Sequence, residues 1–398
     1  MNLNEFVNSL SNGALDSKLK QLYGSSDRSL LRSRARCLNT AERFSRLYPI
    51  CSDIRVFSVP GQTDLSGSLC GERNGCVLAA ASDRDVLAIA SLNGEGIIRV
   101  TADNSPEIAF KVSDLRSRED EQGSLAGLVR AAASEAEKAG IPLRGFDMLV
   151  SSEITDANGQ TAALSVLFAF AIEAMCAETT PETELLIPRA RAAETAFSGS
   201  ASGAAAYRLS AEGGIVFADG AASGEPEISR YDVDISASGY CVCETAGAGK
   251  EQTSFSSDVS KVAAKLGAET LCEVSEEEFF SKLPGLRETF SDTALARAAG
   301  FYAELARLRS AAECLEISDT EGFFGNIDCA GSACEEPLGA KVSRRLLGEN
   351  GAVIDSETVA AFVPNYLVDE YVSGMERVFG PGSCRAGSIR VVGACEIV

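Results

Sequence analysis

The stretch from Val59 to Ala81, VPGQTDLSGSLCGERNGCVLAAA, has the composition of a loop that lines an active site. It leaves an apolar strand, continues through a segment rich in Gly, Ser and Asn, and returns to an apolar strand at Val77. Glycines allow a loop to line the floor of a pocket. Between Asp64 and Glu72, however, there is no charged, His or Tyr side chain that could transfer a proton. Asp64 and Glu72 themselves remain available to bind a polar ligand.

The composition of the whole chain narrows the possible chemistry further. The 398 residues include no His, which removes imidazole as a base, a metal ligand or a pH switch. The 13 Cys form no CxxC pair, so we expect buried thiols and no metal site. Reduced thiols and an N-terminus without a secretory pattern predict a cytoplasmic protein. A formal net charge of -21 disfavours nucleic acid and anionic membranes as partners.

The length and hydrophobic pattern predict two domains, 1–220 and 221–398, with the segment Gly220–Pro226 as the linker. In the first domain, a helical pattern over 4–48 precedes several strands, and an apolar helix follows at 161–176. The Asn93-Gly94 turn predicts that the last two strands of the early group form a hairpin. The early strands are expected at 55–59, 76–81, 86–91 and 97–101.

The second domain alternates between helical and strand patterns, which predicts a second α+β unit. Strands are expected at 240–244, 359–363 and 389–397, and helices at 258–266, 293–314, 339–347 and 366–379. Glu304 and Arg307 are spaced by three residues in one of these helices, so we expect them to pair on its surface.

Several segments resemble, in order, motifs of galactokinase-like members of the galactokinase, homoserine kinase, mevalonate kinase and phosphomevalonate kinase (GHMP) family. The resemblance runs from about Arg55 to Val398. It implies an α+β fold with a mixed-sheet N-terminal domain of the ribosomal protein S5 domain 2-like type and a ferredoxin-like C-terminal domain. The matching segments are FSVPGQTDLSGSLCGERNGCVLAAA, RGFDMLVSSEI, ARAAETAFSGSASGAAAYRLSAEGG and IRVVGACEIV.

The positions that hold and activate the sugar in the family carry other residues in this chain. In the first motif the family's Arg, its Glu or Asn, its His and its Asp fall on Gln62, Ser68, Leu69 and Gly71. Phosphoryl transfer needs positive charge on the reacting phosphate, and Gln62 has none. In the third motif the catalytic Asp falls on Ala206, whose methyl group cannot accept a proton.

The nucleotide-binding motifs of the family are altered as well. The glycine-rich phosphate loop falls on Asp156, Ala157, Asn158, Gly159, Gln160 and Thr161. The charge of Asp156 opposes phosphate, with a Coulomb cost of about 1 to 4 kcal/mol at contact distance. In the structural interpretation, Asp156 instead caps the following helix. A second glycine turn of the family, expected between Ala352 and Ala361, is missing from this sequence.

Glu194 lies within a helical pattern, and we expect it to orient the next loop by hydrogen bonds.

The motifs leave two hypotheses open, and the acidic composition leaves a third, an interaction protein that binds a basic partner through its acidic surface. The first is a galactokinase-like protein without catalysis or cofactor, which binds a sugar-like small molecule or a protein partner. The second is an active carbohydrate kinase of shifted specificity, which uses Mg-ATP to phosphorylate a sugar hydroxyl. Under the second hypothesis, Asp64, Glu72 or Asp156 takes a new catalytic role.

Overall fold

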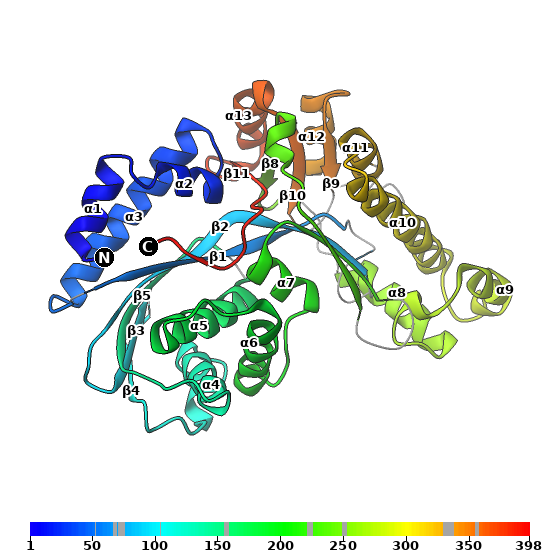
Figure 1. The fold of residues 1–398 in the computed structure, drawn as a ribbon. Coiled ribbons are helices and arrows are strands. Elements are labelled where there is room, and N and C mark those ends of the chain that lie inside the picture. Colours follow the sequence, from blue (N-terminus) through cyan, green and yellow to red (C-terminus); the bar gives the residue numbers. More distant parts are fainter. Residues whose placement is uncertain are drawn as a thin grey trace. The chain divides into compact units, whose positions relative to one another are not determined.

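The computed structural model describes two compact units (Figure 1). Unit 1 comprises Met1–Gln62, Ala81–Gly213 and Arg390–Val398, and unit 2 comprises Thr63–Ala80 and Gly214–Ile389. The described residues are 1–51, 53–66, 70, 76–103, 105–154, 159–220, 226–248, 253–328, 338–354 and 358–398, with the backbone alone at 253–256.

Unit 1 is built on a mixed sheet, as the resemblance implied. Its strands follow the order β12-β1-β2-β5-β3-β4, and β3 runs parallel to β5, whereas β2 runs antiparallel to β5. The strands are β1 (Arg55–Asp64), β2 (Cys76–Leu92), β3 (Ile97–Ala102), β4 (Ile108–Lys111), β5 (Phe146–Ser152) and β12 (Cys395–Glu396).

The predicted hairpin at Asn93-Gly94 is wrong. Strand β5 lies between β2 and β3, with Ile89 opposite Leu149 and Val100 opposite Met148. The apolar residues of β5 are buried on both faces, so this strand is satisfied only with a neighbour on each side. The two strands predicted at 76–81 and 86–91 are also one continuous strand, β2.

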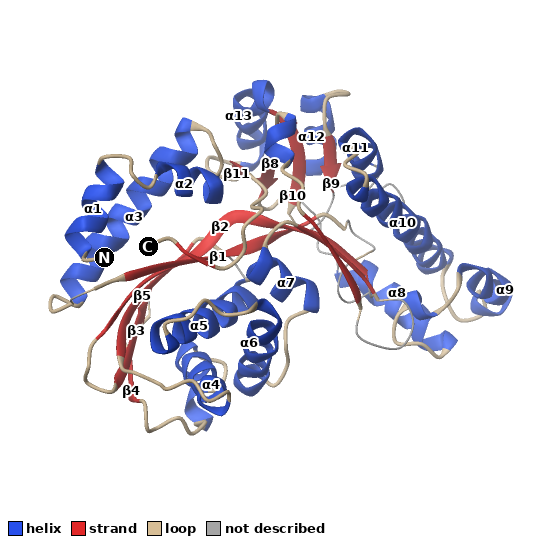
Figure 2. Ribbon diagram, viewed as in Figure 1, coloured by secondary structure: helices blue, strands red, loops and turns tan. Residues whose placement is uncertain are grey.

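Three N-terminal helices cover one face of the unit 1 sheet, where the sequence predicted a single helical region (Figure 2). Phe6, Leu22 and Phe44 from these helices pack against Leu87 and Ile89 of β2. The helices are α1 (Leu3–Ser11), α2 (Asp16–Tyr23) and α3 (Asp27–Leu47).

The opposite face of the sheet carries four further helices. Strand side chains alternate, so Val86 and Ala88 face this second layer while Leu87 faces the first. The helices are α4 (Leu125–Lys138), α5 (Gln160–Ala177), α6 (Thr183–Ser198) and α7 (Ala204–Glu212), and a short 3-10 helix, η2 (Glu119–Glu121), precedes them.

Helix α5 is the central element of this second layer. Among the described helices, it alone is long and apolar enough to cross a membrane, but 72% of that stretch is buried inside the protein. Val166, Phe168 and Phe170 lie in the same apolar cluster as the sheet. The predicted buried helix is therefore confirmed as a core helix.

Unit 2 contains a four-stranded antiparallel sheet of order β11-β8-β10-β9. With helices between the first and second and between the third and fourth strands, the chain follows a β-α-β-β-α-β path, which is ferredoxin-like. The strands are β8 (Tyr240–Thr245), β9 (Ala352–Ile354), β10 (Val359–Pro364) and β11 (Cys384–Gly387). Strand β11 was missed from the sequence, and of the strand expected at 389–397 only β12 forms.

The rest of unit 2 consists of a small strand pair and helices. Strand β6 (Ile215–Asp219) pairs with β7 (Glu227–Tyr231) and with residues 76–80 of β2. The helices are α8 (Thr253–Leu266), α9 (Glu276–Leu286), α10 (Asp292–Glu316), α11 (Thr320–Asp328), α12 (Leu338–Leu347) and α13 (Val368–Phe379), with 3-10 helices η4 (Ile235–Ser238), η5 (Leu271–Glu273) and η6 (Asn365–Leu367).

The two units are discontinuous in sequence, unlike the predicted division into 1–220 and 221–398. Residues 63–80 belong to unit 2 because β2 pairs with β6 there, with Leu78 opposite Phe217. Residues 390–398 belong to unit 1 because β12 pairs with β1, with Phe57 opposite Glu396.

Candidate functional site

The end of β1 and the start of α5 meet in unit 1, and each carries one of the predicted site residues. Gly159 caps the N-terminus of α5 with φ of +74°, a conformation that favours glycine. A Cβ atom placed on Gly159 would lie 3.2 Å from Cδ of Gln62. The Gln62 side chain therefore lies against the N-terminus of α5.

The first turn of α5 is held by side-chain hydrogen bonds. Gln160 Nε2 donates to the carbonyl oxygen of Ile154 at 3.0 Å and to Ser152 Oγ at 3.4 Å. The Thr161 carbonyl oxygen accepts a hydrogen bond from Ser165 Oγ at 2.8 Å. Gln160 thus ties the helix to the end of β5 and acts as a structural anchor.

Six of the predicted site positions lie outside the described residues. They are Ser68, Leu69 and Gly71 of the first motif and Asp156, Ala157 and Asn158 of the phosphate-loop segment. Glu72 and residues 355–357 also lie outside.

Ala206 lies in the first turn of α7, a helix that begins after Gly203. Its side chain is 3% exposed, and its backbone N–H donates to the Gly203 carbonyl oxygen at 3.1 Å. A buried methyl group has no lone pair to accept a substrate proton. The position matched to the family's catalytic Asp is thus occupied by core packing.

Glu194 orients the segment that leads into α7, as predicted. Its carboxylate, on a residue that is 4% exposed, accepts hydrogen bonds from the Ser202 backbone N–H at 3.0 Å and from Ser202 Oγ at 2.7 Å. It also accepts from the Tyr207 hydroxyl at 2.6 Å. Burial and the neighbouring Glu194 raise the pKa of Tyr207, so this hydroxyl stays protonated as a donor.

Asp64 in unit 2 shapes its own loop. One carboxylate oxygen accepts the Ser66 backbone N–H at 2.8 Å, which forms a local turn. Ser66 Oγ donates to the Leu78 carbonyl oxygen at 3.1 Å, so the turn is fixed to strand β2.

The pair of Glu304 and Arg307 was predicted to lie on the helix surface, and that location is wrong for Glu304. Glu304 is only 3% exposed, because α10 packs against both α8 and α11. Arg307 Nη1 donates to the Asn326 carbonyl oxygen of α11 at 2.7 Å. The near absence of amphipathic periodicity in α10 was the sequence signal that both its sides are covered.

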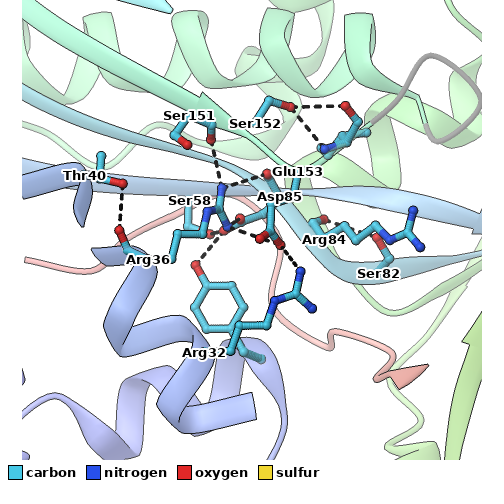
Figure 3. A network of polar contacts seen from close by, with 12 residues as sticks. Arg32, Arg36, Thr40, Ser58, Ser82, Arg84, Asp85, Ser151, Ser152 and Glu153 are labelled. Carbon is cyan, nitrogen blue, oxygen red and sulfur yellow. Dashed lines mark hydrogen bonds and ion pairs between the residues drawn. The ribbon is translucent and has the colours of Figure 1, made fainter. Parts of the chain in front are cut away.

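A buried ionic cluster around Asp85 in unit 1 was missed from the sequence (Figure 3). The Asp85 carboxylate accepts hydrogen bonds from Tyr23 at 2.7 Å, from Ser58 and from Arg36. Arg390 Nη1 lies 3.5 Å from Asp85 Oδ2 and donates a hydrogen bond to Ser58 Oγ at 2.6 Å. The signal was an Asp in the apolar strand context AAASDRDVLAIA, which demands partners.

The charge state of Asp85 follows from these contacts. Burial by itself would raise the pKa of Asp85, but Arg36, Arg390 and the hydroxyl donors hold that pKa below its usual value. Burial and Asp85 raise the pKa of Tyr23. The cluster is thus an ionised carboxylate between two guanidinium groups.

The metal-ligating residue types are dispersed in the part of the chain that the structure describes. No three His, Cys, Asp or Glu side chains in those residues are grouped so as to hold a metal ion. The described cysteines are free thiols, and burial raises the pKa of Cys37 to about 12.

Comparison with solved structures identifies the fold. Lactococcus lactis galactokinase, solved with galactose, superposes with a TM-score of 0.67 at 16% identity and covers 89% of this chain and 98% of its own. Methanococcus jannaschii mevalonate kinase superposes with a TM-score of 0.54 at 11% identity, and the match covers 85% of this chain and 99% of that kinase. Homoserine kinase from Cytophaga hutchinsonii superposes with a TM-score of 0.56 at 13% identity, and the match covers 87% of this chain and 98% of that kinase.

These neighbours are GHMP-family kinases, so the α+β fold of the GHMP kinases is confirmed for this chain. No family model and no curated protein matches the sequence. At these identities the likeness is one of fold, and function has to be argued from the site.

Proposed function

We propose that this chain is a galactokinase-like protein that has lost phosphoryl transfer and serves as a binding module. The observation that carries the proposal is Ala206, a buried methyl group at the position matched to the catalytic Asp. The nearest buried carboxylate in this segment, Glu194, already accepts hydrogen bonds from Ser202 and Tyr207. Gln62 in place of the family's Arg removes a positive charge from the phosphate site.

The proposed ligand is a sugar-like small molecule or a protein, bound in a cytoplasmic setting without a cofactor. The net charge of -21 supports the exclusion of nucleic acid and anionic membranes. Loss of the acceptor Asp and loss of the phosphate-binding Arg each affect a different part of the reaction. Together they leave the scaffold with binding as its remaining role.

One observation favours an active sugar kinase as the second candidate. The α5 N-terminus begins at Gly159 without a side-chain cap among the described residues, so its backbone N–H groups suit an anion. An active protein of this kind would be a phosphotransferase with an alcohol acceptor and would require Mg-ATP.

Turnover distinguishes the two candidates. We expect no ADP release above the spontaneous rate when the protein is mixed with Mg-ATP and a panel of hexoses. A rate on the order of 1 s⁻¹ or more is ordinary for an enzyme and would reject the proposal. The Ala206→Asp and Gln62→Arg variants serve as matched controls and should remain inactive singly, because each restores only one of the lost groups.

Thermal stability reports binding independently of turnover. A ligand at a hundred times its dissociation constant adds about 2.7 kcal/mol to the free energy of unfolding. We expect no shift of the melting temperature with Mg-ATP or Mg-ADP. A nucleotide-dependent shift without turnover would restrict the loss to catalysis, and a shift with a hexose would identify the ligand class.

A further inference from the structure

Helix α3 contacts the last residues of β5, just before the segment that leads to α5. Arg36 Nη2 donates to the Ser151 carbonyl oxygen at 2.8 Å, and Arg32 Nη2 lies 2.9 Å from a carboxylate oxygen of Glu153 (Figure 3). The Arg36 side chain is 12% exposed, whereas that of Arg32 is 47% exposed. Helix α3 therefore contacts the end of β5 through the buried Arg36 and through the exposed Arg32.

Asp85 of β2 contacts both Arg36 of α3 and the segment that follows β5. Its carboxylate binds Arg36, and its carbonyl oxygen accepts the Glu153 backbone N–H at 3.0 Å. If Arg36 left, a carboxylate that is 0% exposed would lose one of its two guanidinium partners. An uncompensated buried charge is strongly unfavourable, so the bound arrangement of α3 is sharply preferred.

The end of β5 in turn holds the first turn of α5. Gln160 Nε2 donates to the Ile154 carbonyl oxygen and to Ser152 Oγ. Ser152 Oγ also accepts the Ile154 backbone N–H at 3.1 Å, which fixes these two residues to each other. Helix α3 thus contacts Ser151 and Glu153, the backbone joins these residues to Ser152 and Ile154, and hydrogen bonds join Ser152 and Ile154 to α5.

We infer that α3 controls the position of the first turn of α5, with Arg36 and Arg32 as positioning residues. Displacing α3 loosens the α5 N-terminus, and ordering the α5 N-terminus strengthens the docking of α3. This reciprocity is required of any coupling between two equilibria. It makes the N-terminal helices a regulatory element for whatever binds at that end of α5, and it holds whether or not the protein is catalytic.

Hydrogen exchange of the full-length protein, followed by mass spectrometry, tests the coupling. In Arg36→Lys we expect exchange in a peptide spanning 160–170 to rise at least tenfold, because one ammonium nitrogen replaces the two guanidinium nitrogens that bind Asp85 and Ser151 separately. Arg32→Ala should raise it by a smaller factor. Exchange in β3 should be unchanged in both variants.

Arg46→Ala is the matched control, since it removes another Arg of α3 whose surface partner is Glu42 of the same helix. It should leave the 160–170 peptide unchanged. The inference is overturned if Arg36→Lys and Arg32→Ala loosen α3 alone, or if they accelerate exchange uniformly across unit 1. The second result would mean a merely structural role.

The reverse experiment keeps the inference testable if Arg36→Lys does not fold. Gln160→Ala breaks the chain of contacts at its other end, on a partly exposed side chain. Exchange in the C-terminal half of α3 should then rise, with the urea midpoint of unfolding nearly unchanged. Unaltered α3 exchange in this variant would contradict the coupling.

Discussion

Asp85 illustrates how a single buried residue of this chain holds several segments together. Its carboxylate accepts hydrogen bonds from Tyr23 of α2, Arg36 of α3 and Ser58 of β1. It also forms an ion pair with Arg390 of the C-terminal segment. Glu194 does the same on a smaller scale between α6 and α7. At the residue scale, the buried carboxylates of unit 1 described above hold segments together and are not available as bases.

Asp85→Asn should lower the free energy of unfolding by about 3 to 5 kcal/mol at pH 7, because it removes the carboxylate beside the buried Arg390 and leaves Arg36 with only the more distant Glu153, at 3.8 Å. Glu42→Gln, at a side chain that is 62% exposed in a surface pair with Arg46, is the control and should change it by less than about 1 kcal/mol. Urea unfolding at equilibrium measures both. Equal effects of the two variants would refute the role given to Asp85.

The same variant predicts a pH dependence. The pKa of Asp85 is lowered from 3.8 in the folded protein, so its ionic contribution is complete above that value. As pH falls below about 3.8 toward the folded pKa, the unfolded state binds more protons and the contribution is lost. The stability difference between wild type and Asp85→Asn should therefore be constant from pH 7 to 5 and should shrink below pH 4. A constant difference down to pH 3 would be inconsistent with this assignment.

Helix α5 shows how an element that begins at a candidate binding position can also be required by the core. Its N-terminus still begins at a glycine with positive φ, and its body is buried among the sheet and the helices of unit 1. The Gln62 side chain packs against the first residue before this helix, Gly159. At the element scale, the helix is required by the core whatever happens to the ligand.

Gly159→Ala should destabilise the protein by about 1 to 2 kcal/mol, because an L-residue at this φ is strained. The added Cβ also comes within 3.2 Å of Gln62 Cδ, so combining it with Gln62→Ala should cost less than the sum of the single changes. Gly159→Asn should cost less than Gly159→Ala, since Asn tolerates the left-handed region. Chemical unfolding of the four variants measures these differences, and strict additivity would exclude the contact.

Unit 1 as a whole is closed by the C-terminal residues. The Val56 N–H donates to the Val398 carbonyl oxygen at 2.9 Å, and the Ile397 N–H donates to the Val56 carbonyl oxygen at 2.7 Å. Arg390 also supplies one of the two positive charges that lie beside the Asp85 carboxylate. The fold of unit 1 thus depends on residues from both ends of the chain.

Deleting residues 390–398 should therefore remove exchange protection from β1 and α3 while β8 and β10 of unit 2 keep theirs. The physical reason is that unit 2 contains its own sheet and core clusters. Glu396→Gln, which removes only the partly exposed partner of Arg55, is the control and should leave both units protected. Loss of protection in both units at once would show that they fold as one.

The sequence by itself indicated the types of most elements, and the resemblance to the GHMP family indicated which candidate site positions carry other residues. The long apolar run of α5 is a local pattern, and local patterns indicate secondary structure directly. Gln62 and Ala206 were singled out by the resemblance to the GHMP family, which matches Gln62 with the family's Arg and Ala206 with its catalytic Asp. The role of Glu194 followed from a polar residue within a buried helical pattern.

Only the tertiary structure decided which of these segments meet. The place of β5 between β2 and β3, the burial of Glu304 and the discontinuous units depend on partners far apart in the chain. Local propensity cannot specify such partners, because strand pairing is set by packing on both faces of the sheet. The Asp85 cluster has the same origin: each residue is ordinary in its own segment, and their shared burial makes them one network.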